Sequence, residues 1–346
     1  MRFVIPMLVL CACGSNVDMS LEGPGGDELI SMMAPSPSTQ LATLARQRDE
    51  VASVSGNRFG RVDPLVKPPR HDAGVAEEVD AGVAEEVDAG VAEEVDAGVW
   101  TPSGPLGASI SPHLGLGIPD DSSVGRADRW LLVRPQFVTS YDTAHKVPNW
   151  SAWKLDSSFF GPATRATSFR TDPLLGSASQ ARDSDYVGSG FDRGHLCPSA
   201  DRTLTDADND STFFLTNVVP QTHASNAGPW LTLEDECRDR ANEGKKLLII
   251  AGPIFASNPQ TIGTGVSVPV SMFKVVIVST GELDAATLDP AAVKVYATIM
   301  PNTSVVTGSW RQWQVRIDDV EAATGLDFFS DVNPSVQAVL EARVDL

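Results

Sequence analysis

Residues 191–202 read Phe191-Asp192-Arg193-Gly194-His195-Leu196-Cys197-Pro198-Ser199-Ala200-Asp201-Arg202. Within them, Asp192–His195 sets an acid, a base, a glycine and a histidine side by side. The chain has five histidines, so one placed between Arg-Gly and a turn-forming proline is conspicuous. A four-residue match still arises by chance too often to assign chemistry. It gains weight from two later stretches, Thr216-Asn217-Val218-Val219-Pro220-Gln221 and Asn226-Ala227-Gly228-Pro229-Trp230-Leu231-Thr232-Leu233-Glu234.

The charge of the chain excludes one common mode of binding to nucleic acid. The 346 residues carry a net charge of -19, with 17 acidic and 7 basic residues in residues 1–100 and 28 acidic and 19 basic residues in the remainder. The chain therefore lacks the broad basic surface that dominates non-specific binding. Any recognition of phosphate must come from a few focused arginines and a metal ion.

The N-terminus has the pattern of an export signal. Arg2 precedes an apolar run over residues 3–12 that is too short to span a bilayer as a helix. Leu10-Cys11-Ala12-Cys13 matches the bacterial lipobox, which implies removal of a signal peptide, residues 1–12, and lipidation of Cys13. Gly14 favours sorting to the outer membrane or the cell surface. The alternative is an ordinary signal peptide cut nearby, which would give a secreted protein.

An acidic linker without a core is expected over residues 13–117, because Pro, Ser, Gly, Ala and Asp dominate there. Within it, an octapeptide repeats over residues 72–99, beginning at Asp72, Asp80 and Asp88. This period is well below the about 20–50 residues of stacking repeats. Repelling acidic charges extend such a segment, which favours a solvated spacer over a calcium-binding or adhesive repeat.

A folded domain is expected over residues 118–346. Apolar and β-branched runs predict strands at residues 130–138, 149–155, 213–219, 246–251, 272–279 and 293–299. Pro229, followed by early acids and late bases, predicts a helix over residues 230–242, and Gly325 ends a second one over residues 318–324. Because strands outnumber helices and alternate irregularly with them, the expected fold class is α+β, a mainly antiparallel sheet flanked by helices.

The chemistry of the three quoted stretches fits hydrolysis of a phosphodiester. A histidine such as His195 is the natural general base near neutral pH. The reaction also needs charge stabilisation on the phosphate and on the leaving oxygen. Magnesium suits this task because it keeps most of its waters and accepts few protein oxygens. The amide oxygen of Asn226 and a water held by Glu234 would be sufficient ligands.

The same stretches resemble the DNA/RNA non-specific endonucleases, which are the ββα-metal or His-Me finger nucleases. The resemblance rests on Asp192-Arg193-Gly194-His195, Thr216-Asn217-x-x-Pro220-Gln221 and Asn226-x-x-x-Trp230-x-x-Leu233-Glu234. Further matches lie at Asn149-Trp150, Thr164-Arg165, Arg170-Thr171-Asp172-Pro173, Ala251-Gly252-Pro253 and Met300-Pro301-Asn302. Together they cover about residues 130–329 and imply an active site of the ββα-metal finger type.

By position, the resemblance implies that His195 accepts the proton of the attacking water and that Asn226 binds the metal directly. Glu234 then hydrogen-bonds a metal-bound water, while Arg165 and Arg193 bind the scissile phosphate as guanidinium forks do. Supporting roles fall to Asp192, Asn217 and Gln221. The implied cofactor is Mg²⁺ or another divalent cation such as Mn²⁺. Taken singly, His195 could be structural, Asn226 a helix cap and Glu234 a partner of the helix dipole. The weaker candidate for a second ligand or base is His223.

The two cysteines of the domain flank the same site. Cys197 follows His195 by two residues, and Cys237 follows Glu234 by three. If His195 and Glu234 face one metal, the thiols lie near each other, and in an exported protein this favours a disulfide. The alternatives are buried free thiols, one exposed thiol, or a zinc site that lacks the usual Cys-x-x-Cys spacing.

The expected function is metal-dependent hydrolysis of DNA and RNA with little sequence preference, by an enzyme anchored to a membrane. Nucleic acid is the expected substrate, and an inhibitor protein is a candidate partner. One alternative is a toxin-type nuclease with a specific target. Another is a surface binding or adhesion lipoprotein on a catalytically decayed nuclease fold. The presence of His195, Asn226 and Glu234 argues against decay.

Overall fold

The computed structural model describes residues 107–345 of the chain. The predicted signal peptide, the lipidation site Cys13 and the repeats of residues 72–99 lie outside the described residues, so the predictions made for them stand as expectations. Among the described residues, no helix combines the length and apolar character needed to cross a membrane.

The centre of the domain is a seven-stranded antiparallel sheet. Its strand order is β1-β2-β3-β6-β9-β10-β11. Its strands are β1 (Trp130–Val133), β2 (Val138–Asp142), β3 (Val147–Leu155), β6 (Lys246–Ile254), β9 (Ser271–Ser279), β10 (Val293–Pro301) and β11 (Gln314–Val315). Two separate hairpins pair β4 (Asp192–His195) with β5 (Val218–Gln221) and β7 (Thr261–Ile262) with β8 (Val266–Ser267). The predicted α+β class with a mainly antiparallel sheet is confirmed.

Both faces of the sheet are covered, as the alternation along β9 shows. Every residue of this strand is buried. Val276 and its same-face neighbours belong to a cluster with Trp230 and Leu233, whereas Val275 and Ile277 belong to a second cluster on the other face. A strand buried on both faces reads as a continuous apolar run, which is why residues 272–279 were recognisable as a strand.

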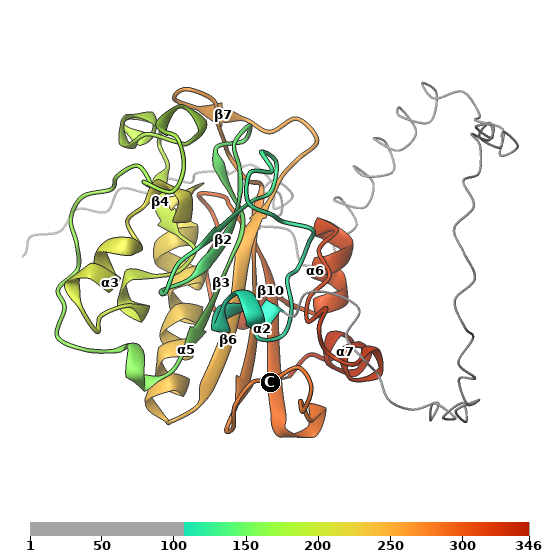
Figure 1. Ribbon diagram of the computed structural model, residues 1–346. Coiled ribbons are helices and arrows are strands. Elements are labelled where there is room, and N and C mark those ends of the chain that lie inside the picture. The colour runs from blue at the N-terminus through green and yellow to red at the C-terminus, as the bar shows by residue number, and fades with distance from the viewer. Residues whose placement is uncertain (1–106, 346) are drawn as a thin grey trace, which may run out of the picture. The chain divides into compact units, whose positions relative to one another are not determined.

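Helices divide between the two faces (Figure 1). The helix α5 (Leu231–Asn242) lies on one face, and α6 (Ile317–Thr324) and α7 (Pro334–Glu341) lie on the other. Shorter helices are α2 (Gly107–Ile110), α3 (Asp206–Ser211) and α4 (His223–Ser225). The helix α6 ends at Gly325, whose φ of 76° is the left-handed conformation that glycine adopts at low cost.

Strand boundaries differ from the sequence prediction at two places. The single strand expected over residues 130–138 is a hairpin of β1 and β2, because the chain turns at Pro135, where the Arg134 amide donates to the Phe137 carbonyl at 3.1 Å. The strand expected over residues 213–219 begins only at Val218. Before it, the backbone of Phe213 and Leu215 bonds to the loop residue Arg170, so these residues are not available to a sheet.

The folded domain also begins earlier than the expected residue 118. His113, Leu114 and Leu116 are all buried, the two leucines in the cluster beneath α6 and α7. The His113 ring Nε2 lies 2.8 Å from the Pro135 carbonyl, and its Nδ1 accepts from the Lys154 amide at 3.1 Å. Isolated apolar residues in a Gly/Pro-rich segment give no periodic signal, so sequence reasoning missed this anchor.

Candidate active site

The two-stranded hairpin and the helix that follows it form a ββα finger. Strand β4 pairs with β5 so that His195 faces Val218 and Gly194 faces Val219. The chain then passes through α4 and a π-helical turn, η8 (Asn226–Trp230), into α5. This order brings residues 192–195 and 226–234 onto one finger, as the motif predicted.

The His195 ring packs against two aromatic rings and is almost fully buried. Its ring packs edge-on against Phe213 at 4.8 Å between centroids and tilted against Phe169 at 5.2 Å. Its exposed fraction is 7%, and its buried Nε2 has no hydrogen-bond partner among the described residues. Burial, with a smaller effect from the cation Arg165, lowers the pKa of His195 to about 3. The imidazole is therefore neutral near pH 7, the state a general base requires.

The two predicted phosphate-binding arginines have different surroundings. Arg165 is exposed, donates to the Ser199 hydroxyl, and lies over the Phe213 ring at 5.2 Å. It therefore shares an aromatic neighbour with His195. Arg193 pairs instead with Asp183, with 2.5 Å between Nε and Oδ1, and donates to the Asp183 carbonyl at 2.8 Å. The Asp183 carboxylate therefore competes with any phosphate for the Arg193 guanidinium.

The side chain of Asn226 is oriented by the carboxylate of Asp192 on strand β4. Its Nδ2 donates to Asp192 Oδ2 at 3.0 Å, and the same oxygen lies 2.9 Å from His223 Nδ1. An amide that gives its nitrogen to Asp192 directs its oxygen away from that carboxylate. The His223 ring, 82% exposed, thus touches the predicted supporting residue Asp192, and the His223 carbonyl accepts a hydrogen bond from the Asn226 amide.

The residues present suit a hard divalent cation. Oxygen ligands from amides, carboxylates and water are those that magnesium, manganese and calcium prefer. The amide oxygen of Asn226 is the available protein ligand. Asp192, which accepts a hydrogen bond from Asn226, supplies negative charge beside it.

Glu234 lies deeper than its predicted role suggests. Its Oε1 lies 3.5 Å from Nζ of the buried Lys274 on β9, which in turn lies 4.0 Å from the centroid of Trp230. Burial raises the pKa of Glu234 to about 6, against the opposing effect of Lys274. Among the described residues, no hydrogen bond joins Glu234 to Asn226. Sequence reasoning missed Lys274, although a lysine inside the apolar run of residues 272–279 was a readable signal.

The supporting residues brace the finger from within. Asn217 accepts from the Cys197 amide and donates to the Cys197 carbonyl, both at 2.9 Å, which fixes the chain just after His195. Gln221 is fully buried beneath Gly194, where an added Cβ would come within 2.2 Å of the Gln221 Oε1. Asn302 donates to the Pro220 carbonyl at 3.0 Å and anchors β5 to the end of β10.

The predicted disulfide between Cys197 and Cys237 is not formed in the structure. Both cysteines are free thiols buried in the same cluster between the finger and the sheet. Burial raises the pKa of each thiol to about 12, so neither is a thiolate near neutral pH. They act here as small apolar residues.

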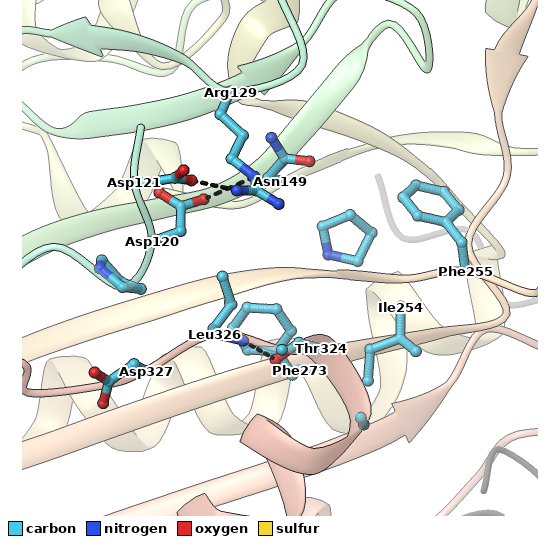
Figure 2. A pocket seen from close by; sticks show the side chains of 14 residues that line it. Asp120, Asp121, Arg129, Asn149, Ile254, Phe255, Phe273, Thr324, Leu326 and Asp327 are labelled. Atoms are coloured by element: carbon cyan, nitrogen blue, oxygen red, sulfur yellow. Dashed lines mark hydrogen bonds and ion pairs between the residues drawn. The ribbon is translucent and has the colours of Figure 1, made fainter. Parts of the chain in front are cut away.

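A separate pocket of about 450 Å³ has no residue of the finger in its lining (Figure 2). It is lined by the end of α6 and by residues of the opposite sheet face, including Phe273. Three of its four charged residues pair with one another, since Arg129 lies 4.0 Å from Asp120 and contacts Asp121. None of the predicted catalytic residues lines this pocket. The finger is therefore the candidate active site.

Comparison with known proteins agrees with this geometry. A family model described as DNA/RNA non-specific endonuclease matches residues 121–335, more than half of the chain. The chain belongs to this family. A curated relative, "Nuclease" from Nostoc sp., is 40% identical over 243 residues, covering 69% of this chain and 88% of the relative. Human "Endonuclease G, mitochondrial" is 31% identical over 216 residues, covering 58% of this chain and 70% of the relative.

A solved structure shares the fold. It is the "Crystal structure of the EndoG/EndoGI complex: Mechanism of EndoG inhibition", which aligns with a TM-score of 0.55 and 24% identity, covering 67% of this chain and 95% of that one. As a DNA/RNA non-specific endonuclease, the chain is a nuclease hydrolase acting on nucleic acid, and its family indicates a divalent cation.

Proposed function

We propose that this endonuclease hydrolyses phosphodiester bonds of DNA and RNA with Mg²⁺, or Mn²⁺ in its place, and with His195 as the base. The proposal rests on the observation that His195 and Asn226 lie on the same ββα finger. His195 is buried, neutral and without a hydrogen-bond partner among the described residues, while Asp192 orients Asn226. Base and ligand are thus prepared by the fold before substrate arrives.

In this proposal the neutral imidazole of His195 takes the proton of the attacking water. Phe169 and Phe213 fix the plane of the ring and keep bulk water away from it. Arg165, held over Phe213, binds the scissile phosphate, and Arg193 joins it after leaving Asp183. A site that contacts phosphates and no base edges explains a lack of sequence preference.

Asn226 would hold the cation through its amide oxygen, and Glu234 would act through a water. When bound, the divalent ion would neutralise charge on the phosphate and the leaving oxygen. For Glu234 to serve, its carboxylate must be ionised. With its pKa at about 6, it is mostly ionised at pH 7. Lys274 supports this state from beneath.

We also propose that the mature enzyme is attached to a membrane through lipidated Cys13, with the acidic segment that contains the repeats of residues 72–99 as a spacer. The lipobox pattern and the acidic repeats of residues 72–99 support this proposal. Metabolic labelling with a fatty acid tests it, because Cys13→Ala should abolish incorporation and release the protein from membranes. An inhibitor protein is a further candidate partner. The solved structure that shares this fold is a complex of EndoG with EndoGI and describes the mechanism of EndoG inhibition.

The test of the catalytic proposal is cleavage of supercoiled plasmid and of an RNA, with magnesium and then with EDTA. His195→Ala should lose about 10²–10⁴-fold in rate with both substrates and keep its metal affinity. Asn226→Ala should lose activity chiefly through metal affinity, so that raised magnesium restores part of the rate. His223→Ala, which removes an exposed histidine of the same finger, is the matched control.

Several outcomes would contradict the proposal. Wild-type rates in His195→Ala would remove this residue from the mechanism. Normal metal affinity in Asn226→Ala would remove the ligand assignment. Cleavage of one defined nucleic acid and no other would favour the toxin-type nuclease, and no cleavage with any divalent metal would favour the binding module.

A further inference from the structure

Three carboxylates meet where the last two helices of the chain pack together. Asp318 and Glu321 lie on α6, and Glu341 ends α7. One oxygen from each of the three lies within 4.8 Å of the other two. These helices cover the sheet face opposite the finger, so this cluster is separate from the active site (Figure 1).

Glu341 makes the cluster more than a group of surface acids. Its exposed fraction is 7%, and its Oε1 is buried without a hydrogen-bond partner among the described residues. A buried and unpaired carboxylate oxygen is costly unless a proton or a cation compensates it.

The other two acids are prepared as ligands and remain accessible. Glu321 Oε1 accepts from the Phe328 amide at 2.7 Å, which holds its side chain in place. Asp318 has a loose ion pair with Arg316 at 3.5 Å, and both acids are partly exposed. Water can therefore complete a coordination shell on the solvent side.

We propose that Asp318, Glu321 and Glu341 form a second, structural cation site that takes Ca²⁺. Calcium takes about 6–8 oxygen ligands, from carboxylates and waters, at about 2.3–2.6 Å. The three carboxylate oxygens lie within 4.8 Å of one another, close enough to share one ion. The ion would link α7 to α6. It would thereby stabilise the packing of Ile317, Val320 and Leu340, which belong to the apolar cluster beneath these helices.

The test uses the whole chain with Asn226→Ala, which removes the proposed catalytic ligand and isolates the second site. Calcium chloride is titrated calorimetrically, and thermal unfolding is followed with calcium and with EDTA. Calcium should bind and raise the unfolding temperature. Adding Glu341→Gln should lower calcium affinity at least tenfold and remove most of the calcium-dependent shift. Asp319→Asn, a change on the same helix outside the cluster, should leave both quantities unchanged.

Two results would overturn the proposal. One is the absence of calcium binding in the Asn226→Ala chain. The other is calcium binding that survives both Glu341→Gln and Glu321→Gln, because the ion would then lie elsewhere. Glu341→Gln should fold, since glutamine keeps the size of glutamate and places no charge in the buried position. Its unfolding temperature in EDTA should equal or exceed that of the parent.

Discussion

Asp192 Oδ2 accepts a hydrogen bond from Asn226 Nδ2 at 3.0 Å, and so fixes which end of the Asn226 amide is left for a cation. Groups that orient a metal ligand typically change metal affinity or activity by about 10–100-fold when they are lost. We therefore expect Asp192→Asn to raise the magnesium concentration for half-maximal cleavage by about this factor, with little change in the unfolding temperature. His223→Gln, which alters the other partner of Asp192, should have a much smaller effect. An unchanged magnesium requirement in Asp192→Ala, which removes the acceptor altogether, would show that Asn226 does not depend on this bond.

Gly194 is the position where the finger tolerates no side chain. A Cβ there would lie 2.2 Å from Gln221 Oε1 and 2.7 Å from Gln221 Cβ. Gly194→Ala should cost about 1–3 kcal/mol in the free energy of unfolding, because β4 and β5 must separate. It should also reduce cleavage, since His195 adjoins it. Urea unfolding measures the cost. Gly176→Ala, where no atom lies within 4 Å of the new Cβ, is the control and should be close to neutral.

Lys274 and Glu234 form a buried ion pair, so the effect of substituting one residue on stability should depend on the other. Lys274 is 1% exposed, with Nζ 3.5 Å from Glu234 Oε1. Lys274→Met should lower the free energy of unfolding by about 3–5 kcal/mol, because it leaves a buried carboxylate unpaired. Adding Glu234→Gln should recover part of this loss. A double-mutant cycle in urea checks the coupling, and strictly additive losses would mean that the two side chains act independently.

His113 should make the free energy of unfolding depend on pH. Burial lowers its pKa to about 4, and its Nδ1 accepts a hydrogen bond that protonation would remove. A histidine depressed in this way contributes stability above its unfolded pKa of about 6.5, and loses it as the pH falls towards 4. The shift corresponds to about 3 kcal/mol. His113→Gln should show a smaller fall in unfolding free energy between pH 7 and pH 4 than the parent chain. His223→Gln, at an exposed site, should retain the full fall.

Local sequence was enough wherever one segment carries its own signal. The strand at residues 272–279 and the helix over residues 230–242 were recognised because apolar runs and terminal charges are properties of single segments. The finger was recognised from the resemblance of its motifs at residues 192–195, 216–221 and 226–234 to those of the family. Errors appeared where distant contacts decide local structure, as at Phe213 and Leu114.

The sequence by itself determined the α+β class and most strands of the central sheet, and its resemblance to the family indicated the residues of the finger. Only the tertiary structure decided the partners of those residues. Arg193 pairs with Asp183, Glu234 rests against Lys274, and Asn226 is turned by Asp192. It also left Cys197 and Cys237 as separate buried thiols. The physical reason is that burial and pairing depend on segments far apart in the chain, whereas the patterns that predict strands and helices depend on neighbours.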